Sequence, residues 1–208
     1  MTRSRKGQRG QETRAKVLAA ATRLFYEQGY LVTTMADIAG QAGVAVQTLY
    51  LGFGSKVELL AAVHDIALVA DDEPISVLER PWRAELQAEP DGPNALRLLM
   101  AQQRDMLERT SRVYGVIAAA AADPEVLDLQ GRLRDQRAVT WRSVAADLAA
   151  KRGYDATVSV DRAADLLYAV TSPELFGLLT TDRGWTANDA TAWMTTILTG
   201  QLFGGAGR

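Results

Sequence analysis

This sequence is poor in thiol and imidazole side chains, which often act as nucleophiles, general bases or ligands of transition metals. The 208 residues contain no Cys and a single histidine, His64, which excludes thiol nucleophiles, Cys-ligated zinc and paired-His metal sites. The run Gly52-Phe53-Gly54-Ser55-Lys56 has only a faint likeness to a phosphate-binding loop, because it lacks the adjacent Gly-Lys pair and a preceding strand. We therefore expect no metal and no cofactor, and we predict that the chain is not an enzyme.

The charge is distributed unevenly along the chain. The net charge is −2 and the pI is near 5.5, but residues 1–63 carry 8 Lys/Arg against 4 Asp/Glu, whereas residues 64–208 carry 15 against 21. This asymmetry indicates a basic N-terminal module. The longest apolar run, residues 116–122, is far shorter than the ~20 residues of a membrane span, and no signal peptide is recognisable. We expect a cytoplasmic protein without a membrane partner.

The apolar residues recur with helical spacing, and no long period-2 alternation occurs. In the first such segment Val17, Leu18, Ala21, Leu24 and Phe25 share one face. The pattern predicts an all-α fold of about nine helices. The predicted helices cover residues 11–28, 35–42, 45–51, a segment that begins at Ser55, 94–110, 111–122, 124–150, 161–180 with a kink at Pro173, and 186–199.

The spacing within residues 35–50 is typical of a helix-turn-helix. Small Ala39 permits close approach of two helices, and Gly43 supplies the turn between them. Apolar Ile38, Val44 and Leu49 are spaced to bury the junction. Any two short helices joined by a glycine are the alternative interpretation.

The longer stretch GYLVTTMADIAGQAGVAVQTLYLGFGSKVELL resembles the N-terminal domain of TetR-family transcriptional regulators. The resemblance covers residues 11–63. The remainder is similar to that family only in size, helix count and a closing Arg183-Gly184-Trp185 before an amphipathic last helix. The resemblance implies a three-helix, helix-turn-helix DNA-binding domain with a basic arm over residues 1–55, and a helical effector-binding and dimerisation domain over residues 56–208.

The resemblance also implies that the second helix of the motif enters the major groove of operator DNA. Gln47 can pair with adenine there, and Val46 can touch a thymine methyl group. Hydroxyl groups can bind phosphates, and Lys56 stands in the first turn of a helix, where a cation is unfavourable unless an anion lies nearby. The predicted DNA contacts are Thr34, Ala45, Val46, Gln47, Thr48, Tyr50 and Lys56.

Two features of the predicted DNA contacts are left undetermined, namely the base preference and the role of the basic arm. Gln47 stands where the family commonly has a small residue, and Gly52 where it often has a bulkier or polar one, so the base preference is not fixed. The N-terminal arm carries Arg3, Arg5, Lys6 and Arg9. These residues either contact phosphates or the minor groove, or form a solubilising tail.

Polar residues within apolar helix faces indicate where an effector would bind, because an unpartnered buried polar group is costly. The candidates for the pocket of a small, largely apolar effector are His64, Met100, Gln103, Tyr114, Arg137 and Trp141. Each of them also has a plain alternative as a core or paired residue. The apolar stripes of the last helices predict a homodimer interface, against the alternative that they pack within one chain. Its candidate residues are Leu167, Val170, Trp193, Met194 and Ile197.

These expectations combine into one hypothesis with two alternatives. The hypothesis is a sequence-specific transcriptional regulator, a dimeric repressor that a small-molecule effector releases from double-stranded operator DNA. The first alternative is a DNA-binding regulator without such an effector. The second is an all-α small-molecule enzyme, which no recognisable catalytic motif in the sequence supports.

Overall fold

A computed structural model describes the backbone of residues 5–70 and 77–204, with side chains from residue 9 onward in these ranges. Contacts divide the chain into two compact units. The first unit comprises Met1–Ala67 and Val113–Gln130, and the second comprises Leu68–Arg112 and Gly131–Arg208.

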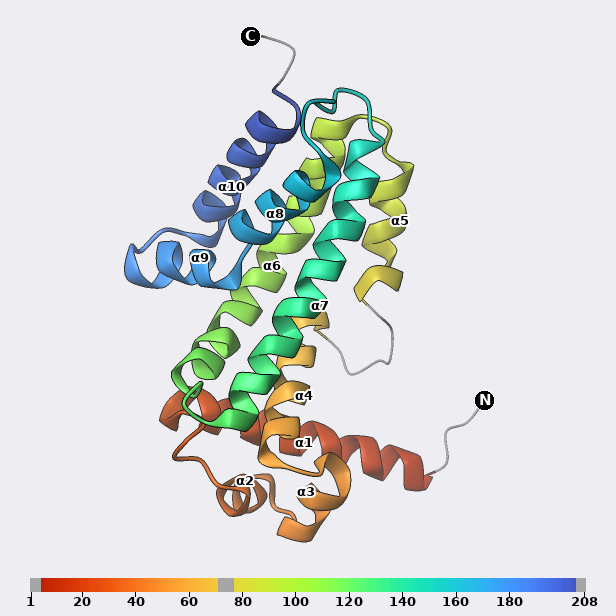
Figure 1. Ribbon diagram of the computed structural model, residues 1–208. Helices are drawn as coiled ribbons and strands as arrows, with labels where there is room; N and C mark the ends of the chain where they lie inside the picture. The colour runs from red at the N-terminus through yellow and green to blue at the C-terminus, as the bar shows by residue number, and fades with distance from the viewer. Residues whose placement is uncertain (1–4, 71–76, 205–208) are drawn as a thin grey trace. The chain divides into compact units, whose positions relative to one another are not determined.

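The first unit holds four N-terminal helices: α1 (Arg5–Gln28), α2 (Met35–Ala42), α3 (Val46–Phe53) and most of α4 (Lys56–Val69). Helix α1 packs on α2, and α2 packs on α3 (Figure 1). The face of α1 predicted from its spacing is the buried one. It consists of Val17, Leu18, Ala21, Leu24 and Phe25.

Local signals explain where these helices begin and end. Helix α1 ends before Gly29, which has a left-handed φ of 83° that costs a glycine little. Thr34 caps α2 by accepting a hydrogen bond from the Asp37 amide. The Ser55 hydroxyl accepts one from the Glu58 amide at 3.2 Å, which caps α4 at the residue where this segment was predicted to begin.

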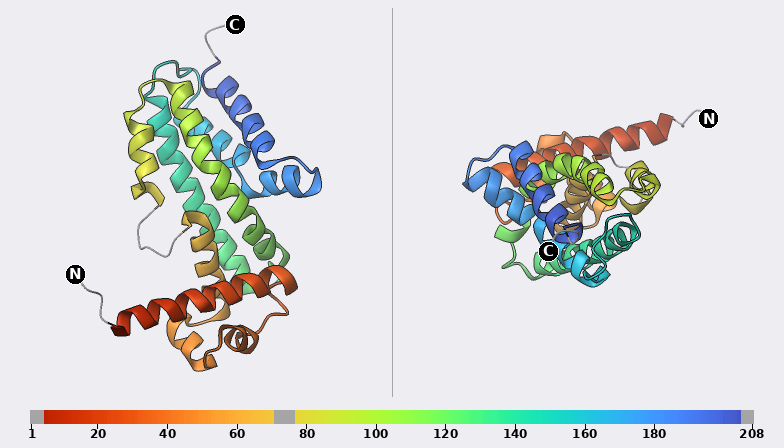
Figure 2. Two further views of the ribbon diagram at one scale, coloured as in Figure 1. Left: turned by 180° about the vertical axis from the view of Figure 1, so that it is seen from behind. Right: turned by 90° about the horizontal axis from the view of Figure 1, so that it is seen from above.

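The second unit contains the remaining helices. They are η1 (Val77–Glu79), α5 (Pro81–Ala88), α6 (Gly92–Ala119), α7 (Pro124–Ala149), α8 (Val160–Val170), α9 (Pro173–Gly177), η2 (Leu178–Asp182) and α10 (Ala187–Leu202). Helices α6 and α7 continue into the first unit at residues 113–130. Within the second unit they run side by side in opposite directions, and α8 lies against α10 (Figures 1 and 2). Residues of α5, α6, α7, α8, α9 and α10 share one apolar core.

The all-α prediction is confirmed, since the described residues form helices and no strand, but three details were wrong. Helix α6 continues through Ser111, because the Thr110 hydroxyl donates to the Met106 carbonyl at 2.8 Å and is satisfied inside the helix. Helix α5 was missed, although Pro81 at its first position is a starting signal. The segment 161–180 is interrupted at Pro173, as predicted, but by a complete break between α8 and α9 and not by a kink, and it ends in a π-helical turn. No helix among the described residues is both long enough and apolar enough to cross a bilayer.

Candidate nucleic-acid interface and ligand cavity

The turn between α2 and α3 has the geometry that the residue spacing predicts. Gly43 adopts φ 69° and ψ 37°, and its amide donates to the carbonyls of Ala39 and Gly40. Ile38 and Leu49 are fully buried, and Val44 is half-buried. These side chains pack in the junction between α2 and α3, and this packing fixes the direction in which α3 presents its outer side chains.

Helix α3 exposes a row of side chains that we call the α3 face: Gln47, Thr48, Tyr50 and Leu51. Ala45, the residue before the helix, is also exposed, whereas Val46 is half-buried. Tyr50 is 53% exposed, in keeping with a contact residue and not a core aromatic. Leu51, which the sequence analysis did not select, is 90% exposed. Its position one turn after Gln47 was the available signal.

Thr34 is already engaged in capping α2. Its hydroxyl donates to Asp37 Oδ2 at 2.6 Å and accepts from the Asp37 amide at 3.1 Å, while the Thr34 amide donates to the same carboxylate at 3.0 Å. These hydrogen bonds lower the pKa of the Asp37 carboxyl, the side chain of Thr34 contributing most. A phosphate contact by Thr34 would have to share this hydroxyl or use the backbone.

Lys56 has partners inside the first unit. Its Nζ donates to the carbonyl oxygens of Tyr30 and Thr33, each at 3.0 Å, and lies 4.1 Å from the centroid of the Tyr30 ring. A DNA phosphate is therefore not needed to explain a cation at the start of α4. An ammonium group has three N–H donors, and these two bonds leave one that can bind a phosphate. A phosphate contact by Lys56 therefore stays a prediction.

Tyr30 is itself buried, with 2% of its surface exposed. Burial raises the pKa of its phenol to about 12, and the carboxylates of Asp123 and Glu125 add to this effect. The ring thus stays neutral beneath Lys56 over the ordinary pH range. Ionisation of Tyr30 therefore affects the stability of this loop only at high pH.

The basic arm is described only in part. Arg3 lies outside the described residues, and so do the side chains of Arg5 and Lys6. Arg9 is exposed and lines an open hollow of about 390 Å³ between α1 and α3. The residues around this hollow are Arg9, Gly10, Thr13, Arg14, Val17, Thr48, Gly52 and Phe53. Positive charge therefore borders the α3 face at Thr48.

The six predicted pocket residues are divided between the two units. In the first unit His64 and Tyr114 meet edge to face with ring centroids 5.3 Å apart. His64 is buried, and its Nδ1 lies 3.3 Å from the Asp65 carboxylate. Its Nε2 has no hydrogen-bond partner among the described residues. The pair forms part of that unit's interior.

In the second unit Gln103, one of the predicted residues, lines a cavity that we call the α5–α6 cavity. Met100 and Trp141 are core residues, 2% and 4% exposed. Arg137 pairs with Glu174 at 3.0 Å and lies 4.0 Å from the centroid of the Tyr168 ring. Met100 and Trp141 thus have the core role that was the alternative for each of them, and a contact of any of these four residues with an effector stays a prediction.

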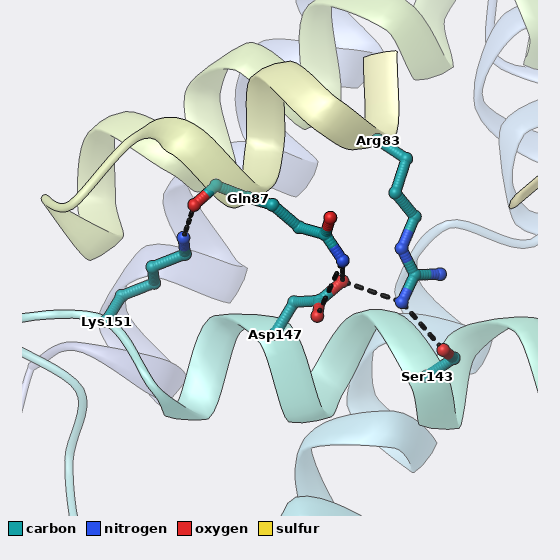
Figure 3. Close-up of polar contacts among 5 residues, drawn as sticks. All are labelled: Arg83, Gln87, Ser143, Asp147 and Lys151. Atoms are coloured by element: carbon teal, nitrogen blue, oxygen red, sulfur yellow. Dashed lines mark hydrogen bonds and ion pairs between the residues drawn. The ribbon is translucent and has the colours of Figure 1, made fainter. Parts of the chain in front are cut away.

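A polar cluster holds α5 against α7 (Figure 3). The Arg83 guanidinium donates to Ser143 Oγ at 2.7 Å and pairs with Asp147 at 2.8 Å. Gln87 Nε2 also donates to the Asp147 carboxylate, and Lys151 Nζ donates to the Gln87 carbonyl at 2.7 Å. The cluster fixes the helix that carries Trp82, one wall of the α5–α6 cavity.

The predicted dimer residues differ in their exposure. Leu167 and Met194 are fully buried in the core of the second unit, as the alternative of packing within one chain requires. Val170 is half-buried. Trp193 and Ile197 stand 38% and 36% exposed on α10, and Trp193 meets Trp185 edge to face at 6.2 Å. Val170, Trp193 and Ile197 keep exposed surface that a partner could contact, and the dimer interface stays a prediction.

Comparison with known proteins agrees with this geometry. The family model for bacterial regulatory proteins of the tetR family matches residues 17–63. The transcriptional regulator TtgR of Pseudomonas putida is 34% identical over 127 residues, which are 61% of this chain and 58% of TtgR. The match thus spans little more than half of that relative's length.

Solved structures share the fold along nearly the whole chain. NalD of Pseudomonas aeruginosa superposes with a TM-score of 0.65 at 19% identity, over 93% of this chain and 97% of NalD. The SmeT–triclosan complex gives a TM-score of 0.70 at 20% identity, over 92% and 91% of the two chains. Residues 17–63 therefore form a helix-turn-helix domain of the tetR family of bacterial regulatory proteins.

Proposed function

We propose that the chain is a sequence-specific DNA-binding transcriptional regulator, a dimeric repressor released from its operator by a small-molecule effector. The observation that carries the proposal is the α3 face: Gln47, Thr48 and Tyr50 are exposed on a helix whose direction is fixed by the buried Ile38 and Leu49. A helix presented in this way can place an amide and hydroxyl groups against base edges and phosphates in a major groove.

The effector part of the proposal has separate support. Helix α4 begins at Lys56, which is bonded to the loop before α2, and ends with Leu68 and Val69, which line the α5–α6 cavity. A ligand that favours one position of this helix would change DNA affinity by its differential binding energy. Of the two similar structures, SmeT is in complex with triclosan, and NalD is the secondary repressor of a multidrug efflux pump.

The test of DNA binding uses the full chain and a pool of random duplexes. Repeated selection should enrich one sequence, arranged as an inverted repeat with half-sites about one helical turn or a multiple apart, if a dimer binds. Affinity for it should fall ~10³- to 10⁵-fold between 50 and 200 mM salt if 6–10 phosphates are contacted. Tyr50→Ala should weaken binding to every duplex, and Gln47→Ala should relax the selected sequence. Equal affinity for selected and scrambled duplexes would contradict the proposal.

The effector requirement is tested on the same duplex. Compounds that shift the thermal unfolding of the protein are added to the protein–DNA complex, and release of the duplex is followed. A regulator without an effector would show no ligand-dependent release, and that outcome would favour the first alternative. The cytoplasmic location and the domain boundary between Ser55 and Lys56 remain proposals of the same kind.

A further inference from the structure

The α5–α6 cavity is small and lies wholly within the second unit. It has a volume of about 130 Å³. A cavity of about 150 Å³ accommodates one benzene ring, so this space suits one ring and not a drug-sized molecule. Its lining residues are Leu68, Val69, Val77, Arg80, Trp82, Gln102, Gln103, Met106 and Arg109.

The charge of the lining is of one sign. Arg80 and Arg109 contribute guanidinium groups, and the described lining residues include no acid. Each guanidinium has five N–H donors, so it can bind a carboxylate while it keeps other contacts. Planar carboxylates match this donor geometry well.

Gln103 adds a second polar group that a ligand has to satisfy. The residue is 6% exposed, and its Oε1 has no hydrogen-bond partner among the described residues. A buried acceptor without a partner is unfavourable, and the terminal torsion of a glutamine is soft. A ligand that donates an O–H or N–H can therefore draw this oxygen toward the cavity and satisfy it.

The remaining walls are apolar or aromatic. They include Trp82 and Met106, and an indole ring and an adaptable thioether are both suited to contact with a flat ring. Trp82 is held in place because the next residue, Arg83, ties α5 to Ser143 and Asp147 of α7 (Figure 3). The wall is thus fixed before a ligand arrives, which lowers the cost of binding.

We infer that the α5–α6 cavity binds a small aromatic carboxylic acid that carries a hydroxyl group, with the carboxylate at the lining arginines and the hydroxyl donating to Gln103. The inference deepens the proposed function, because it names the chemical class of the effector. It also differs from the sequence-based expectation of a largely apolar effector.

The first experiment is calorimetric titration of the full-length protein with three matched probes. These are 4-hydroxybenzoate, benzoate, which lacks the donor, and methyl 4-hydroxybenzoate, which lacks the charge. We expect 4-hydroxybenzoate to bind about tenfold more tightly than either of the others, since each lacks one polar contact. Equal binding of the ester and the acid, or no binding of any probe, would overturn the inference. The unaltered protein decides this point, so no variant has to fold.

The second experiment assigns the two contacts. Gln103→Met keeps the length of the side chain and should abolish the preference for 4-hydroxybenzoate over benzoate, while the preference for acid over ester remains. Arg109→Met should reduce the preference for acid over ester. Arg97→Met, at an exposed arginine of the same helix, is the control and should change neither. If the two cavity variants keep both preferences, the probe binds elsewhere and the assignment is wrong.

The titration contains no DNA, and this separates the two proposals. Failure of all three probes leaves the DNA-binding proposal untouched. Failure of the duplex selection overturns the regulator proposal, whereas the ligand class of the cavity is still decided by the probes.

Discussion

The ammonium group of Lys56 lies 4.1 Å from the centroid of the Tyr30 ring and donates to the carbonyl oxygen of the same residue at 3.0 Å. A second bond of equal length reaches the carbonyl of Thr33. Lys56 therefore ties the beginning of α4 to the loop between α1 and α2. The positive charge there has a structural role of its own, whether or not DNA is bound.

Replacement of this lysine should first of all destabilise the fold. Lys56→Met keeps most of the side-chain length and removes the charge. We expect the free energy of unfolding to fall by about 3 kcal/mol, the lower end for two hydrogen bonds from a charged donor at about 1.5–3 kcal/mol each. Urea unfolding measures this loss, and Lys16→Met on the exposed side of α1 is the control. An unchanged urea midpoint would show that the contacts contribute nothing. DNA affinity of the variant is interpretable only at temperatures where it is folded.

Tyr30 should make the stability sensitive to alkaline pH. In the unfolded chain a tyrosine ionises near pH 10, whereas in the folded state the pKa is raised to about 12, mainly by burial. The folded state therefore holds its proton when the unfolded state has lost it, and the free energy of unfolding should decrease as pH rises from about 10 to 12. Tyr30→Phe should show a smaller decrease. The free energy of unfolding of both proteins is measured by urea unfolding at each pH. The difference between them removes the contribution of lysine ionisation, and parallel curves would refute the prediction.

Thr34 should contribute to stability through its cap and not only through DNA. Thr34→Ala removes the bonds to Asp37, and we expect a loss of about 1 kcal/mol, as for other N-caps, while Thr34→Ser retains most of it. The pKa of the Asp37 carboxyl is held below its ordinary value by Thr34. The part of the stabilisation that comes from the carboxylate is therefore present above the ordinary pKa and lost as pH falls through the lowered one, whereas the bond from the Asp37 amide to the Thr34 hydroxyl does not titrate. In Thr34→Ala the pKa of Asp37 should return toward the ordinary range. NMR titration of the Asp37 carboxyl measures this directly, and an unshifted pKa in the variant would speak against the cap.

The helix-turn-helix could be predicted because its determinants are local. Thr34 and Asp37 signal the start of α2, and Gly43 signals its end a few residues later. The buried residues Ile38 and Leu49 follow from the same spacing. Each signal depends on neighbours in the sequence, and the structure places all of them as expected.

The cavity and the dimer residues depend on distant neighbours, and here the sequence was less informative. Gln103 was recognisable as a polar residue on an apolar face. Arg80 and Trp82, which line the same cavity, lie at and near the start of α5, in a proline-containing stretch without a clear period. Leu167 and Met194 have the spacing of an interface, yet they are buried by helices of the same chain. Periodicity identifies an apolar face and does not say which element covers it.

We expect Leu51 to contact a thymine base. It is 90% exposed and stands one turn after Gln47 on the α3 face, so a helix that brings Gln47 to a base edge brings an apolar side chain to a neighbouring base. An exposed leucine gains little from phosphate, whereas the C5-methyl group of thymine in the major groove is an apolar partner. We therefore expect a thymine beside the base that Gln47 contacts in each half-site.

The chemical test removes only that methyl group. In the selected duplex each thymine is replaced in turn by deoxyuridine, and one replacement should weaken binding of the unaltered protein by about fourfold per half-site, the equivalent of about 0.8 kcal/mol for a buried methyl group. In Leu51→Ala the same replacement should have no effect, because the contact is already lost. Leu127→Ala, at another exposed leucine, should retain the full fourfold effect. If deoxyuridine weakens Leu51→Ala as much as the unaltered protein, the methyl group contacts another side chain, and Val46 is then the residue to replace.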